Sequence, residues 1–380
     1  MSPVPFREFV LKIASRCNLA CDYCYVYTGP DQTWRAQPLV MSTEVIETTA
    51  RQIGEHARAH RLDRVRVGLH GGEPLLAGQQ TVERAISALR SAAPAGTLVE
   101  LTVQTNGTLL DEGYLRLLAR HRVRVGISLD GSARSNDKHR IHADGRSSFP
   151  AVARSAGLLA SEQYRQLFSG ILCTIDLAND PVETYRSLLG HHPPMIDFLL
   201  PHANWSQPPP GAPDPDSARY AGWLIPVFDA WYTDSAPAAD VRLFTTILRL
   251  LLGGRSGIET VGGSPLAYAV VQTDGAIEAS DSLRTAYDGA AATGMSVFTS
   301  SFDEALRHPA FTALQDVQDQ LCATCLSCPV LTVCGGGQYA HRYRAGAGFG
   351  RPSVYCADLT RLIGHIAGRV RADLRAASAR

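Results

Sequence analysis

Lysine is scarce in this sequence, and Lys12 and Lys138 are the only two. Arginine supplies the remaining positive charge, and 36 basic residues balance 36 acidic ones. Because the charge is balanced and no basic run occurs, neither nucleic acid nor an anionic membrane is expected as the principal partner. Apolar runs as long as the roughly 20 residues of a membrane span are also missing, and the segment before Cys17 lacks the pattern of a signal peptide. These absences predict a soluble, cytoplasmic protein.

The 380 residues suffice for two or three domains. Apolar or β-branched runs alternate with helical patterns through the first two-thirds of the chain. The expected strands are 9–13, 65–69, 99–103, 123–129, 168–175 and 196–200, and the expected helices are 43–60, 80–92, 111–120, 149–161 and 181–189. Strand followed by helix about six times predicts an α/β fold with right-handed βαβ units and a parallel sheet or partial barrel.

Polar motifs follow the first four expected strands. They are the segments 17–24, 70–74, 104–107 and 128–131. Functional side chains of such folds gather at the carboxyl ends of the strands. The sequence therefore predicts a site built from these four segments.

Nine cysteines form two groups, with Cys173 alone between them. The first group is Cys17, Cys21 and Cys24, and the second is Cys322, Cys325, Cys328, Cys334 and Cys356. In a reducing compartment, clustered cysteines are more often metal ligands than disulfide partners. Cys173 lies in an apolar strand pattern and is expected to be a buried small hydrophobe.

The first group lies on a loop, which can wrap three thiolates around one iron–sulfur cluster. Three ligands for four irons leave one iron open to bind a substrate, in the way that a catalytic zinc keeps an open position. Zinc is the alternative, but structural zinc sites normally have four ligands, and no nearby residue supplies the fourth.

With Tyr23 before the last of these cysteines, the spacing resembles the motif of the radical S-adenosyl-L-methionine (SAM) enzymes, and Gly71-Gly72-Glu73-Pro74 is a second match. The resemblance implies a partial (β/α)6 TIM-like barrel. It also implies a 4Fe–4S cluster whose open iron is chelated by SAM. Reductive cleavage of SAM would then give methionine and a 5′-deoxyadenosyl radical, which takes a hydrogen atom from the substrate.

The resemblance also implies individual SAM contacts. Gly71 and Gly72 would admit the methionine amino group, Glu73 would orient it, and Tyr23 would contact the adenine. Ser128 and Asp130 would bind the ribose or the carboxylate, and Arg140 would pair with the carboxylate. The full set of expected SAM contacts is Tyr23, Gly71, Gly72, Glu73, Pro74, Gln104, Thr105, Asn106, Ser128, Asp130 and Arg140. Residues 71–74, 105–107 and 130–131 are also compatible with ordinary turns.

The distal cysteines resemble the C-terminal SPASM or twitch domain of radical SAM peptide maturases. This resemblance implies an auxiliary 4Fe–4S cluster held by Cys325, Cys328, Cys334 and Cys356, with Cys322 as the spare thiol. The family's second auxiliary cluster is expected to be absent, because Gln338 and Ser280 stand where cysteines are needed. A four-cysteine zinc ribbon is the alternative. The expected domains are a barrel over 1–235, a helical linker over 236–262 and a SPASM/twitch-like domain over 263–380.

Further segments resemble the FxsB-type radical SAM/SPASM proteins. They are 198–205, 271–275, 334–343 and 352–356. The resemblance implies an oxidoreductase that modifies a ribosomally synthesised precursor peptide. It would join an aromatic ring to the β-carbon of a residue two positions on, which closes a three-residue cyclophane. Asp281 is the candidate catalytic base, since related sulfatase maturases carry an aspartate there after a cysteine. An exposed turn aspartate is equally compatible.

Other functions stay open at this stage. They are sulfatase-maturase-like oxidation of Ser or Cys, thioether formation, peptide epimerisation and a non-enzymatic iron–sulfur electron carrier. The expected partners are the precursor peptide and an electron donor such as flavodoxin or ferredoxin.

Overall fold

A computed structural model describes residues 3–211, 214–316 and 319–378. Within them, a single sheet runs in the order β10-β9-β8-β1-β2-β3-β4-β5-β6-β7. The strands are β1 (Glu8–Ala14), β2 (Arg64–Gly71), β3 (Leu98–Thr105), β4 (Arg124–Ser128), β5 (Phe168–Thr174), β6 (Met195–Leu199), β7 (Asp240–Val241), β8 (Tyr268–Val271), β9 (Ala276–Glu278) and β10 (Ala292–Ser296). All pairs from β1 to β7 are parallel.

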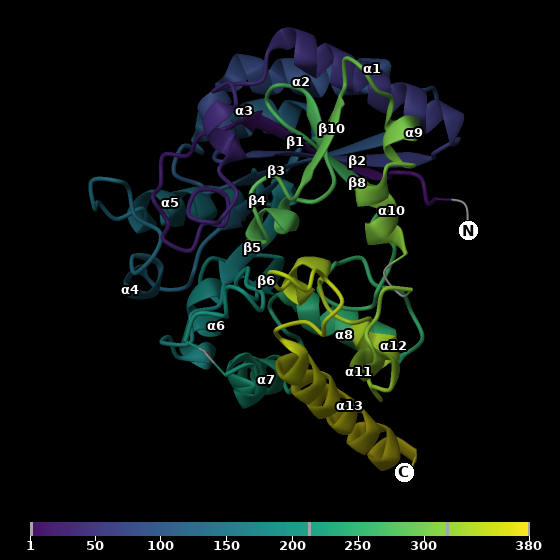
Figure 1. Ribbon diagram of the computed structural model, residues 1–380. Helices are drawn as coiled ribbons and strands as arrows, with labels where there is room; N and C mark the ends of the chain where they lie inside the picture. Colours follow the sequence, from purple (N-terminus) through teal and green to yellow (C-terminus); the bar gives the residue numbers. More distant parts are fainter. Residues whose placement is uncertain (1–2, 212–213, 317–318, 379–380) are drawn as a thin grey trace.

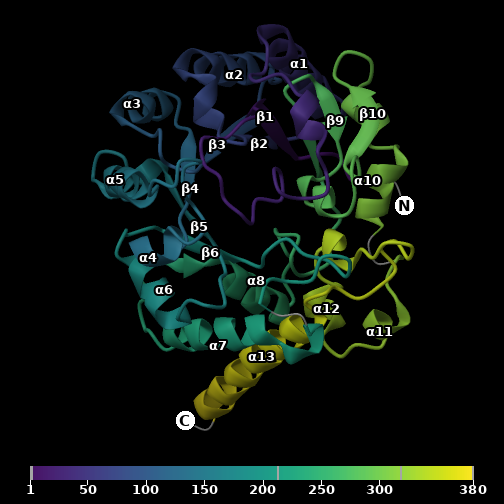
Figure 2. The ribbon, with the colours of Figure 1, turned by 60° about the vertical axis from the view of Figure 1, so that its left-hand side comes forward.

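Helices alternate with the strands, and α1, α2, α3, α5 and α6 cover the outer face of the curved sheet (Figure 2). They are α1 (Thr43–Ala59), α2 (Gln79–Ala92), α3 (Glu112–Arg120), α4 (Ala133–Asn136), α5 (Phe149–Ala160), α6 (Pro181–Leu189), α7 (Arg219–Tyr232), α8 (Arg242–Leu251), α9 (Phe302–Ala305), α10 (Pro309–Gln315), α11 (Ala323–Leu326), α12 (Leu331–Cys334) and α13 (Cys356–Ser378). The partial barrel expected from the strand–helix alternation is confirmed.

Side-chain caps fix where several helices begin. Ser42, Asp111 and Asp180 each accept a hydrogen bond from the backbone N–H three residues on, at 3.2, 2.9 and 2.8 Å. Such caps satisfy one of the amide groups left free at a helix start. Strand β1 is buried at every position from Leu11 to Ala14, as expected of a parallel strand covered on both faces.

The sheet continues across the expected boundary at residue 263. β8 lies parallel to β1, with Phe9 opposite Ala269 and Leu11 opposite Val271. β9 and β10 then extend the sheet as an antiparallel pair. The cysteine-rich segment and α13 lie beside α7 and α8 (Figures 1 and 2). The C-terminal region therefore contributes strands to the barrel sheet as well as cysteines.

No helix within the described ranges is long and apolar enough to cross a lipid bilayer.

Candidate active site

The carboxyl ends of the parallel strands surround a cavity of about 390 Å³. Every strand from β2 to β6 contributes to its wall, together with the loop that follows β1. Among the residues expected to act here, those lining it are Cys17, Cys21, Tyr23, Cys24, Gly71, Gly72, Gln104, Thr105, Asn106, Ser128 and Arg140. The fold thus brings most of the expected cluster ligands and SAM contacts to one place.

The three cysteines of the first group are free thiols on one wall of this cavity. The backbone N–H of Leu19 and Asn106 Nδ2 point at Cys17 Sγ, at 3.4 and 3.6 Å. Burial raises the pKa of Cys21 to about 12, so a cation is needed to hold this sulfur as a thiolate. Three sulfurs on the wall of one cavity fit a 4Fe–4S cluster, which these cysteines would hold with three protein ligands.

Tyr23 and Arg140 form one side of the cavity next to the cysteines. The Tyr23 hydroxyl donates to Asp130 and accepts a hydrogen bond from Arg140 Nη1 at 2.9 Å. Arg140 Nε is buried without a hydrogen-bond partner among the described residues. A free guanidinium donor on the cavity wall fits a carboxylate ligand such as that of SAM.

Asp130 lies behind this side and not on the cavity wall. Its carboxylate is buried, and it also accepts from the Thr174 N–H at 2.9 Å. The structure therefore places Asp130 where it orients Tyr23, and not in contact with the ligand space as the sequence suggested.

Glu73 and Pro74 are likewise absent from the cavity wall. The Glu73 carboxylate is fully buried and accepts hydrogen bonds from Thr105 Oγ1 at 2.6 Å, the Asn106 N–H at 2.7 Å and the Leu75 N–H at 3.0 Å. Glu73 therefore joins the loop after β2 to the loop after β3. In this geometry Glu73 stabilises the two loops, whereas the sequence suggested that Glu73 contacts the methionine amino group directly.

Gly71 and Gly72 are required by close contact with the loop after β1. A Cβ at Gly71 would lie 2.1 Å from the Ala14 carbonyl oxygen, and one at Gly72 would lie 2.5 Å from that of Arg16. A side chain at either position would displace this backbone. Glycine is needed here for the fold of the cysteine loop, in addition to any approach of a ligand.

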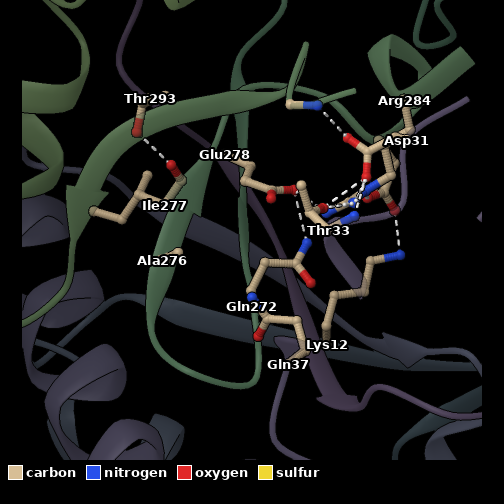
Figure 3. A network of polar contacts seen from close by, with 12 residues as sticks. Lys12, Asp31, Thr33, Gln37, Gln272, Ala276, Ile277, Glu278, Arg284 and Thr293 are labelled. Carbon is tan, nitrogen blue, oxygen red and sulfur yellow. Dashed lines mark hydrogen bonds and ion pairs between the residues drawn. The ribbon is translucent and has the colours of Figure 1, made fainter. Parts of the chain in front are cut away.

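Asp281 belongs to a buried charged network and does not line the cavity. Its carboxylate forms an ion pair with Lys12, and Arg284 Nε lies 3.5 Å from Asp281 Oδ1. Arg284 also binds Asp31 at 2.8 Å and Glu278, as Figure 3 shows. Lys12 and Arg284 hold the pKa of Asp281 well below its usual range despite burial. A carboxylate that is held in ion pairs and does not line the cavity cannot take a proton directly from a substrate bound there, which argues against Asp281 as the base.

Three histidines on the cavity wall were not identified from the sequence as site residues. Desolvation by the surrounding protein lowers the pKa of His70 and His202 to about 4 and that of His341 to about 3, so all three are neutral near pH 7. The His202 ring lies 4.3 Å from the Tyr25 ring and 6.2 Å from the His341 ring. The available signal was the position of His202 just beyond a predicted strand.

These residues come from distant parts of the chain. Tyr25 follows the cysteine triplet, His202 follows β6, and His341 lies in the 3-10 turn Tyr339–Arg342. The side chain of His202 is exposed within the cavity, and no hydrogen bond to its ring is found in the described ranges. His202 is therefore a neutral imidazole free to contact a ligand.

Four of the five distal cysteines line a second, smaller cavity of about 40 Å³: Cys325, Cys328, Cys334 and Cys356. Cys322 does not line it. Four convergent thiols fit a metal centre with four protein ligands. The ligand set inferred from the sequence therefore has a common location, with Cys322 outside it.

Polar side chains occupy the positions where a second auxiliary cluster would need cysteines. Gln338 Nε2 donates to Glu259 at 3.1 Å, and the hydroxyls of Tyr268 and Ser280 lie 2.6 Å apart. Neither glutamine nor serine carries a thiol, so these two positions offer no thiolate ligand. Cys173 is buried in β5, as expected.

Comparison with known proteins gives a family for the barrel. Residues 11–188 match the sequence profile of the Radical SAM superfamily. A cysteine-type anaerobic sulfatase-maturating enzyme of Clostridium perfringens (strain 13 / Type A) is 27% identical over 286 residues, which are 72% of this chain and 73% of that enzyme.

Two solved structures extend the likeness over most of the chain. That of anSMEcpe with bound AdoMet and Cp18Cys peptide has a TM-score of 0.83 and 21% identity, and it covers 97% of this chain and 99% of its own. That of Streptococcus suis SuiB bound to precursor peptide SuiA has a TM-score of 0.57 and 14% identity, with 89% and 73% covered. These structures share the fold of the barrel and its cysteine-rich C-terminal region. Residues 11–188 therefore form a radical SAM domain, and this domain makes the chain an enzyme that uses SAM and a 4Fe–4S cluster as cofactors.

Proposed function

We propose that this enzyme modifies a ribosomally made precursor peptide by joining an aromatic ring to the β-carbon of a nearby residue. The observation that carries the proposal is the single cavity in which the three-cysteine site faces Leu199, Leu200 and Pro201 and the neutral rings of Tyr25 and His202. An uncharged wall of this kind favours an aromatic or aliphatic side chain over a charged one. Peptides bound to anSMEcpe and SuiB support a peptide as the substrate class.

The residues around the cavity have separate proposed roles. Cys17, Cys21 and Cys24 hold the 4Fe–4S cluster, while Tyr23 and Arg140 bind SAM beside it. When bound, these cofactors supply a carbon radical that removes a hydrogen atom from the substrate. The loops held together by Glu73 keep this part of the cavity in place, and the apolar wall excludes water from it.

Closing the ring releases one further electron and one proton from the substrate. His202 is the proposed proton acceptor, because it is neutral, exposed within the cavity and unpartnered in the described ranges. Cys325, Cys328, Cys334 and Cys356 would hold an iron–sulfur centre, which would supply the one-electron acceptor that this step needs. The substrate thus loses two hydrogens in total.

The second candidate is oxidation of one Ser or Cys to an aldehyde. It is favoured by the likeness to the sulfatase-maturating enzyme of C. perfringens. The polar pairs Gln338–Glu259 and Tyr268–Ser280 count against a full set of auxiliary clusters here. From Ser this reaction also removes two hydrogens, so mass alone does not separate it from ring closure. From Cys the aldehyde forms only after water also replaces sulfur by oxygen with release of hydrogen sulfide, so the mass change differs.

Tandem mass spectrometry of a small peptide encoded beside this gene tests the proposal. The peptide is co-expressed with the enzyme or with the Cys17→Ala variant. Loss of two hydrogens, with no backbone fragments inside a three-residue window that contains an aromatic residue, is the expected result. Loss of two hydrogens with complete fragmentation would favour one-residue oxidation. An unchanged mass, with 5′-deoxyadenosine formed only when Cys17 is present, would reject that peptide as the substrate.

A further inference from the structure

Arg342 is a fully buried cation beside the four-thiol cavity. Its Nε donates to the Gly336 carbonyl at 3.0 Å, and its Nη2 lies 3.2 Å from the carbonyl oxygens of Gly335 and Gly337. Its Nη1 has no hydrogen-bond partner among the described residues. The guanidinium is therefore held by neutral carbonyl groups on one side and is left unsatisfied on the other.

No carboxylate lies within 4 Å of Arg342 in the part of the chain that the structure describes, since it forms none of the ion pairs found there. The other deeply buried guanidinium of this region, Arg284, is matched by Asp31 and Glu278. Burying an unpaired charge is costly, and proteins normally match such a charge with an anion or neutralise it. Arginine remains charged in proteins, so Arg342 requires an anion that the carboxylates do not supply.

The thiols of the four-cysteine cavity are the anionic groups available. Gly336, whose carbonyl Arg342 binds, lines that cavity together with Cys325 and Cys334. A Cβ on Gly336 would lie 2.5 Å from Arg342 Nη2, so the guanidinium and the cavity wall are in direct contact. Four thiolates around a 4Fe–4S cluster in its oxidised state leave a net charge of about −2 on the centre.

We propose that Arg342 is the counter-charge of an anionic metal–thiolate centre held by Cys325, Cys328, Cys334 and Cys356, and that it raises the reduction potential of this centre. The proposal rests on the auxiliary site proposed above. Reduction adds one electron to the centre and changes no bond or proton. A fixed positive charge stabilises the more negative, reduced form, so the centre accepts an electron more readily with Arg342 in place.

Arg342 acts through the centre and is a positioning residue. It ties the Gly335–Gly337 turn to the cavity while supplying charge. If the role of Arg342 were only structural, any substitution at this position that leaves the metal bound would also leave the reduction potential of the centre unchanged. The electrostatic role predicts that the potential follows the charge at position 342.

The test is an anaerobic redox titration, followed by electron paramagnetic resonance, in protein that also carries Cys17→Ala. This substitution removes the barrel cluster, so the signal comes from the distal centre. In this background we compare Arg342→Gln, Arg342→Lys and a matched control, Arg344→Gln, at an exposed arginine two residues away. Arg342→Gln is expected to shift the midpoint potential to more negative values, while Arg342→Lys stays near the parent and Arg344→Gln leaves it unchanged.

Equal midpoint potentials for Arg342→Gln and the parent, at equal iron content, would overturn the proposal. Metal analysis of the parent separates this failure from that of the proposed function. Zinc in place of iron would reject the 4Fe–4S assignment, and the counter-charge would then be tested by the rate of zinc release to a chelator. Faster release from Arg342→Gln than from Arg342→Lys supports the counter-charge, and equal rates reject it. If Arg342→Gln binds too little iron for the redox titration, the rate of iron release to a chelator is compared between Arg342→Gln and Arg342→Lys, with the same two outcomes.

Discussion

Replacing Arg284 with methionine removes the central cation of the network in Figure 3. Arg284 joins the loop after the cysteine triplet, through Asp31 and Thr33, to Glu278 on β9. Its side chain is 3% exposed and that of Asp31 is 1% exposed. Methionine fills a similar volume and carries no charge, so Asp31 and Glu278 would be left buried without a cation.

Breaking a buried ion pair from one side costs about 3–5 kcal/mol. The entropy of unfolding of 380 residues, at roughly 2.1 cal/mol/K per residue, is about 0.8 kcal/mol/K. The expected fall in melting temperature is therefore about 4–6 °C. Because Asp31 lies on the loop after Cys24, the variant is also expected to bind less iron at the barrel site.

Scanning calorimetry of the anaerobically purified protein measures the shift. Arg58→Met is the control, since Arg58 is exposed on α1 and forms no ion pair among the described residues. Adding Glu278→Gln to Arg284→Met removes one of the unpaired carboxylates and should recover part of the loss. A melting temperature for Arg284→Met equal to that of the control would refute the reasoning.

Three further predictions concern single residues. Cys322→Ala is expected to keep the iron content, whereas Cys334→Ala loses about four irons per chain by metal analysis, as a four-thiolate 4Fe–4S site requires. Gly72→Ala should lower the free energy of unfolding, measured by chemical denaturation, by about 1–3 kcal/mol and weaken SAM binding, because the new Cβ collides with backbone. Gly157→Ala is the control: its Cβ meets open space, so the free energy of unfolding should rise by about 0.5–1 kcal/mol. His202→Asn should lower the yield of modified peptide about 10²–10⁴-fold, while 5′-deoxyadenosine is still formed. If the ratio of modified to unmodified peptide, measured by mass spectrometry, stays the same as in the parent enzyme, His202 is not the proton acceptor.

Local sequence patterns were enough to predict the strands and helices of the barrel. The expected strand over 9–13 is observed as Glu8–Ala14, and the helix expected over 181–189 has these bounds in the structure. Each element carries its own signal in apolar runs, caps and turn residues. The pairing of β8 with β1 was not predicted, because β8 has only four residues and its partner is set by tertiary packing.

The same limit applies to the site. Cysteine spacing and the strand ends indicated which segments converge on the cavity, because strand order in a parallel sheet fixes where the ends meet. The ion pair of Lys12 with Asp281 joins residues far apart in the chain and leaves no local signal. Asp281 was therefore a candidate base only through the resemblance to the sulfatase maturases. The neutral state of His202 follows from its desolvation inside the cavity, which no short motif encodes.

The parallel pairing of β1 with β8 sets an order of events during synthesis. Leu11 pairs with Val271, which the ribosome adds 260 residues later. At about 5–20 residues per second, that interval is about 13–52 s. Throughout it, one edge of an apolar central strand has no partner in the sheet, and such edges template aggregation. The barrel therefore cannot complete its sheet co-translationally until most of the chain has been made, and slow translation would prolong the exposure of this strand edge.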